Sequence, residues 1–193
     1  MNKFFFCKIS AIIFFVGCTS NNSKSSEFNL KFKALDSEFT GVTFNNELKS
    51  ENDLNIIEYL YYYNGGGVAL GDINNDGLDD IFFSGNEVND ELYLNEGNMV
   101  FKNISESSGI ANQNYWSNGV SMADVNNDGY VDIYVSTVSD YKNLIGNNRL
   151  YINNGDLTFT ESSKKIGLDF QGFGTHASFF DYDNDGDLDV YLL

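Results

Sequence analysis

Three short acidic segments have the residue types and the spacing that a hard divalent cation requires. They read D-I-N-N-D-G-L-D-D from Asp72, D-V-N-N-D-G-Y-V-D from Asp124, and D-Y-D-N-D-G-D-L-D from Asp181. Side-chain oxygens at positions 1, 3, 5 and 9, with the backbone carbonyl at position 7, can converge on one ion, and the glycine at position 6 permits the sharp turn. The predicted ligands are Asp72, Asn74, Asp76, Leu78, Asp80, Asp124, Asn126, Asp128, Tyr130, Asp132, Asp181, Asp183, Asp185, Asp187 and Asp189.

Calcium is the ion that this donor set favours. It tolerates six to eight oxygen ligands at roughly 2.3–2.6 Å, whereas magnesium prefers a stricter octahedron with retained waters. Without a cation, the five aspartates of the third segment would repel one another. A solvated acidic turn is the alternative for one segment, but three copies with matching Asp and Gly positions favour metal binding. The sequence therefore predicts about three calcium ions (Ca2+).

Two other kinds of calcium loop are excluded by position 12. EF-hands need an acidic residue there. Dockerin-type loops also require an acidic residue at this position, and they are flanked by helices. Here position 12 is Phe83, Val135 or Leu192. These residues are apolar and lie in strand-like segments, so both alternatives fail.

The acidic segments recur together with strand-like segments that must position them. Their starts are 52 and 57 residues apart. Each is preceded by a short run of small or apolar residues (G-V-A-L-G, G-V-S-M-A, H-A-S-F-F) and followed by I-F-F, I-Y-V or V-Y-L. Runs of this length, rich in β-branched and aromatic residues, are typical of strands.

Two more strand-like elements recur after each of the first two loops. Residues 92–95 (L-Y-L-N) match residues 150–153 (L-Y-I-N), and Phe101 and Phe159 follow at equal spacing. A glycine and an aliphatic residue close each unit, at Gly109-Ile110 and Gly167-Leu168. Four short strands with turns between them are the plan of a propeller blade. The predicted fold is all-β: a partial β-propeller of about two and a half four-stranded blades, with calcium loops between strands one and two.

These boundaries divide the chain into repeats. Repeat 1 covers residues 67–110, repeat 2 covers 111–168, and a truncated repeat 3 covers 169–193. Residues 28–66 form an N-terminal strand segment, with a strand expected at Asn29–Lys33, and a Tyr-rich lead-in. Because propellers close with roughly four to eight blades, we expect a fragment of a longer protein or a truncated product. Its open strand edges would favour association or aggregation.

The N-terminus predicts export. Residues 1–17 contain lysines and an apolar run, Ile9 to Val16, that is too short to span a bilayer and fits a signal peptide. The run ends at Cys18, followed by a polar tether (18–27), which resembles a bacterial lipoprotein signal with Phe15 in the usual place of leucine. We expect lipidation at Cys18 and a place in the cell envelope, anchored in the outer membrane, or outside the cell. An ordinary cleaved signal is the alternative.

Composition excludes several classes of function. The formal net charge is −17, so nucleic acids and anionic lipid surfaces would be repelled. Beyond Cys7 and Cys18 there is no cysteine, and His176 is the single histidine. No nucleophile elbow or zinc-protease motif is present. A polysaccharide lyase needs a placed base and cationic groups against uronates, which this composition disfavours, so no enzymatic activity is expected.

Residues 28–193 resemble the FG-GAP, or VCBS-type, repeats of integrin-like propellers, and they are most similar to bacterial relatives of the cartilage acidic protein family. The stretches Y-N-G-G-G-V from Tyr63, W-S-N-G-V from Trp116, and F-D-Y-D from Phe180 carry the resemblance. It implies a calcium-loop propeller. Full-length relatives have more repeats and often a C-terminal ASPIC/UnbV domain, which this chain lacks, so no ligand of the family is carried over.

Aromatic residues gather before the first strand of each unit, at the rim opposite the acidic loops. They could stack on sugar rings or form a protein-binding face; packing between neighbouring blades is the alternative. The candidates are Tyr62, Tyr63, Tyr115, Trp116 and Phe173. We therefore expect an exported calcium-binding module that binds a glycan or protein. A polysaccharide-active propeller enzyme and a non-functional remnant are the alternatives.

Overall fold

Antiparallel strands make up most of the regular structure in the computed structural model, which describes residues 32–50, 53–110 and 115–193. The predicted signal peptide, Cys18 and the polar tether lie outside these residues. Within them, no helix has the length and apolar character needed to cross a membrane. Residues from Leu35 onward form one unit.

The strands form three small sheets in which each strand pairs with its neighbour in the sequence. The first sheet contains β1 (Val68–Gly71), β2 (Asp80–Phe83), β3 (Glu91–Asn95) and β4 (Phe101–Asn103). The second contains β5 (Trp116–Ala123), β6 (Asp132–Val138), β7 (Arg149–Asn153) and β8 (Phe159–Glu161). The third contains β9 (Ala177–Phe180) and β10 (Asp189–Leu192).

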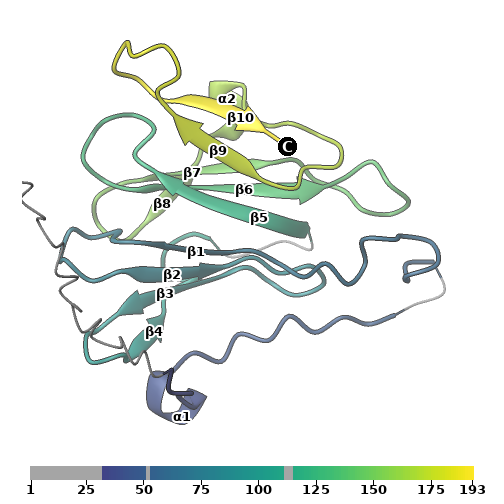
Figure 1. Cartoon of the computed structure of the whole chain (residues 1–193), viewed down its shortest axis with the longest axis horizontal. Coiled ribbons are helices and arrows are strands. Elements are labelled where there is room, and N and C mark those ends of the chain that lie inside the picture. The colour runs from purple at the N-terminus through teal and green to yellow at the C-terminus, as the bar shows by residue number, and fades with distance from the viewer. Residues whose placement is uncertain (1–31, 51–52, 111–114) are drawn as a thin grey trace, which may run out of the picture. The chain divides into compact units, whose positions relative to one another are not determined.

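All pairings are antiparallel, and equivalent residues occupy equivalent places in the two larger sheets. Tyr93 pairs with Ile81 in the first sheet, as Tyr151 pairs with Ile133 in the second. The first strands β1, β5 and β9 lie side by side, with β5 between the other two (Figure 1). The prediction of an all-β fold made of small antiparallel sheets, consistent with a propeller-like arrangement, is confirmed.

The core lies between successive sheets. One cluster joins Phe82 and Leu92 of the first sheet to Val135 and Tyr151 of the second. Another joins Tyr134 and Leu150 of the second sheet to the hairpin of β9 and β10. Removing these apolar side chains from water provides the main driving force for stacking the sheets.

Two four-residue helices end in the same way and occupy equivalent places. Helix α1 (Ser37–Thr40) is capped by the Asp36 carboxylate and ends at Gly41, and α2 (Ser163–Ile166) ends at Gly167. Both glycines are left-handed, with φ of 76° and 84°. This recurrence shows that part of the repeat is present ahead of β1. Of the strand expected at Asn29–Lys33, residues 29–31 lie outside the described residues, and the last two form no strand.

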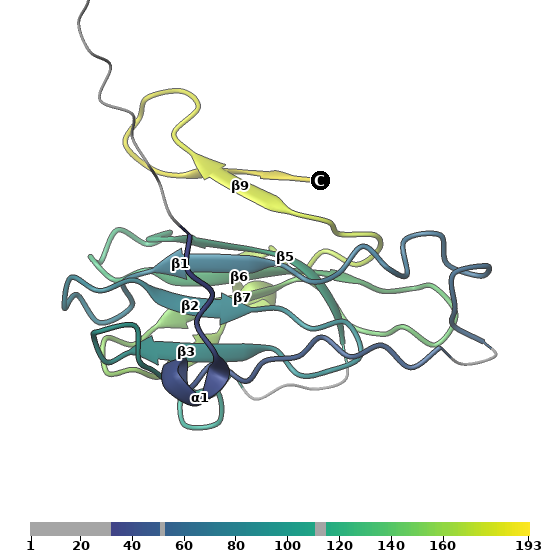
Figure 2. The same ribbon diagram turned by 60° about the horizontal axis from the view of Figure 1, so that its bottom comes forward.

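The segment after α1 runs along the first sheet before the chain turns back toward β1 (Figure 2). Phe44 stacks on Phe83, with ring centroids 4.9 Å apart. Asn46 and Asn86 exchange two hydrogen bonds, of 2.7 and 3.0 Å. These contacts fix the lead-in that carries the aromatic residues.

Candidate functional site

The three acidic loops share one backbone conformation, and they lie at one end of the strands (Figure 1). At position 4, Asn75, Asn127 and Asn184 all have a left-handed backbone, with φ of 61°, 58° and 61°. Asparagine tolerates this conformation better than most residues. At position 6, Gly77, Gly129 and Gly186 have φ of 87°, 90° and 96°. Sequence reasoning missed position 4, although an asparagine stands there in every copy.

Side chains at positions 1 and 5 turn back into their own loop. The position-6 glycine N–H donates to the position-1 carboxylate in every loop, at 2.7, 2.8 and 3.2 Å. The position-7 N–H donates to the position-5 carboxylate at 2.9, 2.9 and 3.1 Å. For Asp72, slight burial raises the pKa, but N–H donors from Gly77, Asp76 and Asn74 outweigh it and lower the pKa overall. Each loop thus fixes its position-1 and position-5 carboxylates through N–H groups of its own backbone.

In the third loop, the carboxylates form a donor set that fits one calcium ion. One oxygen from each of Asp181, Asp183 and Asp189 lies within 4.8 Å of the others, and all three residues are exposed. Oxygens bound to one calcium at 2.3–2.6 Å can be about 5 Å apart at most. A side-chain hydrogen bond to Asp185 and the negative charge of Asp185 raise the pKa of Asp187, so this loop carries strong repulsion.

Position 9 has a second role in the first two loops. Asp80 is buried, and its two oxygens accept N–H bonds from Ile73 in the loop and Asn95 at the end of β3, at 2.9 and 2.7 Å. Asp132 does the same with Val125 and Asn153, at 3.0 and 2.8 Å. These carboxylates tie the loop to the third strand of its sheet, a role that the spacing alone did not reveal.

Burial raises the pKa of Asp80, and the charges of Asp76 and Asp72 act in the same direction, while the two N–H donors oppose them. Asp189 differs, because one oxygen accepts from Tyr182 at 2.9 Å and its sheet has no third strand among the described residues. The third loop therefore leaves more carboxylate oxygen available to a cation than the other two.

At the opposite rim, two of the five aromatic candidates are buried. Tyr62 is 0% exposed and Trp116 is 2% exposed. Their ring centroids are 5.4 Å apart, in a cluster that also contains Leu54, Tyr59 and Val138. The proposal that these two side chains contact a ligand is therefore corrected: they pack the Tyr-rich lead-in against the second sheet.

The other three candidates differ in position. Tyr63 and Phe173 are exposed, at 64% and 52%. Tyr115 is half-buried, with the Arg149 guanidinium 4.6 Å from its ring centroid. Tyr61, which the sequence did not single out as a ligand residue, is 61% exposed and faces the same rim.

Glycines let the segment before β1, strand β5 and the segment before β9 approach one another. A Cβ atom at Gly67 would lie 2.7 Å from the Asn118 carbonyl oxygen, and one at Gly119 would lie 2.4 Å from that of Thr175. The Gly119 N–H donates to the latter carbonyl at 2.9 Å. His176 takes the equivalent place in the third unit, where it is exposed. Close packing between neighbouring units thus requires glycine at positions 67 and 119.

Known proteins share this repeat. Residues 72–135 and 138–192 match the family model of the FG-GAP-like repeat, together more than half of the chain. Over 135 residues, 68% of this chain, it is 32% identical to cartilage acidic protein 1 of Xenopus tropicalis and of Mus musculus, and 30% identical to that of Homo sapiens. The match covers 19–20% of each relative, so the chain spans about a fifth of their length. The chain belongs to the FG-GAP-like repeat family.

Proposed function

We propose that this chain is an exported, calcium-stabilised binding module that attaches to a glycan or protein and catalyses no reaction. The observation that supports this most is the common conformation of the three acidic loops, with convergent carboxylates in the third. The relatives named cartilage acidic protein 1 are consistent with a binding or adhesion role. The proposed location of the protein is the cell envelope or the outside of the cell. It would attach to the membrane only through a lipid on Cys18.

The residues of each loop have two roles: some would bind the cation, and others attach the loop to its sheet. Positions 1, 3 and 5, with the position-7 carbonyl, would hold the ion, which supplies positive charge to offset the repulsion among the carboxylates. Asp80 and Asp132 also hold the loop against β3 and β7 through backbone N–H groups. A filled loop would therefore stiffen the strand ends and keep the opposite rim in place.

Calorimetric titration of the full chain tests this proposal. We expect about three calcium ions, bound with Kd values on the order of 10⁻⁴–10⁻³ M, and much weaker magnesium binding. The third loop, with the most carboxylate donors, should bind tightest. The double variant Asp181→Asn/Asp183→Asn should lose one site. The control Asp140→Asn changes an exposed aspartate outside the loops and should keep all three. Absence of calcium binding, or equal preference for magnesium, contradicts the proposal.

The anchor is tested separately. Replacing Cys18 with alanine removes the thiol that would carry the lipid, so the chain should lose lipid labelling and recovery in the membrane fraction of a bacterial host. Metabolic labelling with a fatty acid, followed by fractionation, measures both. If the Cys18→Ala variant partitions into the membrane fraction like the parent, Cys18 is not the anchor.

A further inference from the structure

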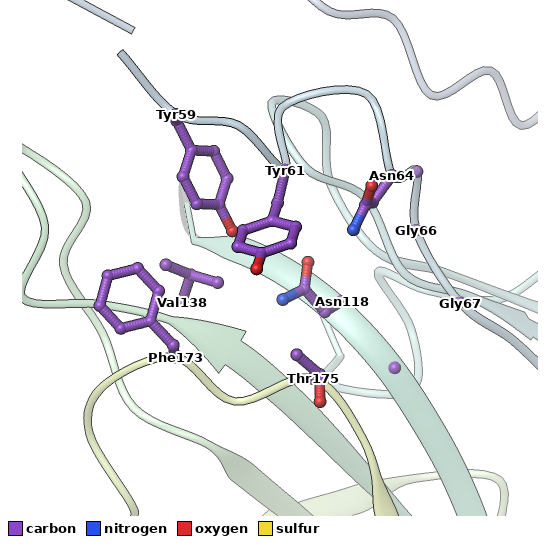
Figure 3. Close-up of a pocket in the computed structure, with 11 residues that line it drawn as sticks. Tyr59, Tyr61, Asn64, Gly66, Gly67, Asn118, Val138, Phe173 and Thr175 are labelled. Atoms are coloured by element: carbon purple, nitrogen blue, oxygen red, sulfur yellow. The ribbon is translucent and has the colours of Figure 1, made fainter. Parts of the chain in front are cut away.

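A cavity of about 490 Å³ opens at the rim opposite the acidic loops, where the segment before β1, strand β5 and the segment before β9 meet. Its size is within the range of small-molecule sites, about 300–1,000 Å³. Figure 3 shows its side chains around one space, with the Tyr61 hydroxyl directed into it. The residues that matter for recognition are Tyr59, Tyr61, Asn64, Asn118, Phe173 and Thr175.

The walls of this cavity are held by the fold. The Tyr59 ring is buried against Trp116, with centroids 5.6 Å apart and nearly perpendicular planes. The Asn118 side-chain amide donates to the carbonyl of Gly174 at 2.8 Å, which links β5 to the lead-in of β9. The site is therefore largely formed before any ligand arrives, which lowers the entropic cost of binding.

The lining combines aromatic faces with amides and contains no charged side chain. Tyr61 and Phe173 expose more than half of their surface. Within the described part of the chain, the Asn64 side-chain amide, the Asn118 Oδ1 and the Tyr61 hydroxyl make no hydrogen bond, so they remain available to a ligand. A lining that contains no Asp, Glu, Lys, Arg or His offers no counter-charge to an ionic ligand, and the net charge of −17 repels anions.

We propose that this cavity binds one uncharged sugar unit of a glycan, an inference that rests on the binding role proposed above and names its ligand class. The C–H face of a pyranose ring packs on an aromatic ring, and its hydroxyls exchange hydrogen bonds with Asn64 and Asn118. A concave site of this volume favours a sugar over a protein surface, which needs a contact of about 800 Å² on each partner.

Four neutral disaccharides test the proposal on the full chain in saturating calcium: cellobiose, lactose, mannobiose and N,N′-diacetylchitobiose. Digalacturonic acid serves as the anionic comparison. Trp116 is the only tryptophan and contacts Tyr59, so its fluorescence reports on the cavity, and calorimetry gives the affinity. At least one neutral disaccharide should bind saturably, and digalacturonic acid should bind at least about tenfold more weakly.

Matched tyrosine variants locate the site. Tyr61→Ala should weaken the bound disaccharide about five- to tenfold through loss of the aromatic contact. Tyr191→Ala removes a similarly exposed ring of β10 outside the cavity and should change the affinity by at most about twofold. Both rings are largely exposed, so both variants should fold, and calcium titration of each confirms that the module is intact.

Three results overturn the inference: no binding of any neutral disaccharide by a chain that binds calcium, equal or tighter binding of digalacturonic acid, or equal effects of the two tyrosine variants. The first result, no disaccharide binding, does not contradict the calcium-stabilised module and makes a protein the remaining candidate ligand. Loss of calcium binding in the parent chain contradicts the proposed function instead, so the two failures are distinguishable.

Discussion

Replacing Arg149 with methionine should lower the free energy of unfolding by about 3–5 kcal/mol, because it leaves a buried aspartate without its charge partner. Arg149 Nη2 lies 2.9 Å from the Asp90 carboxylate, and the two side chains are 4% and 0% exposed. Burial raises the pKa of Asp90, and the guanidinium opposes that rise. Urea unfolding measures the loss.

This ion pair also joins two sheets. Asp90 precedes β3, whereas Arg149 begins β7 and also donates to the Ser117 hydroxyl at 2.7 Å. The double variant Arg149→Met/Asp90→Leu should regain much of the lost stability, because no unpaired charge remains. An unfolding free energy of Arg149→Met within about 1 kcal/mol of the parent contradicts a structural role for the pair.

A surface pair provides the control. Lys142 and Glu58 also form an ion pair, but their side chains are 31% and 45% exposed. Water and salt screen such a pair, so Lys142→Met should leave the urea midpoint nearly unchanged. A large loss in this variant would mean that burial does not explain the effect at Arg149.

Calcium should have the other large effect. Three sites with Kd values of about 10⁻⁴–10⁻³ M, filled at about 10 mM CaCl2, should raise the unfolding free energy by about 4–8 kcal/mol in total. Binding to the folded chain alone produces this shift by mass action. Urea unfolding in CaCl2 and in EDTA measures it, and MgCl2 at equal concentration controls for ionic strength.

The double variant Asp181→Asn/Asp183→Asn should show less than about two thirds of that shift, because it lacks the tightest of the three sites. Asp140→Asn, with an aspartate replaced outside the loops, should show all of it. If the midpoint is the same in CaCl2 and EDTA, calcium does not stabilise the fold, whatever the loops bind.

Local patterns were enough to predict the strands and the acidic loops. The run I-F-F after Asp80 alternates in burial as β2, and L-Y-L-N and L-Y-I-N lie within β3 and β7. The acidic segments form turns between first and second strands because each has a glycine and an asparagine at left-handed positions. Such signals lie within about ten residues of one another, so a single sequence reveals them.

Contacts between distant segments were not predictable in this way. Asp90 and Arg149 are 59 residues apart, and nothing near either one indicates the other. Tyr62 and Trp116 resemble exposed rim aromatics until the lead-in folds against the second sheet and buries them. The register shift in β5 between Ser117 and Val120 spans Asn118, which lines the cavity, and nothing in the local sequence indicates it.

The central claim is that each acidic loop holds one calcium ion, and equilibrium dialysis of the full chain against radioactive calcium tests it most directly. At saturation, the account predicts about three ions per chain, and one fewer when Asp181 and Asp183 are both changed to asparagine. A parent chain that retains no calcium, or the loss of no ion in that variant, would contradict it.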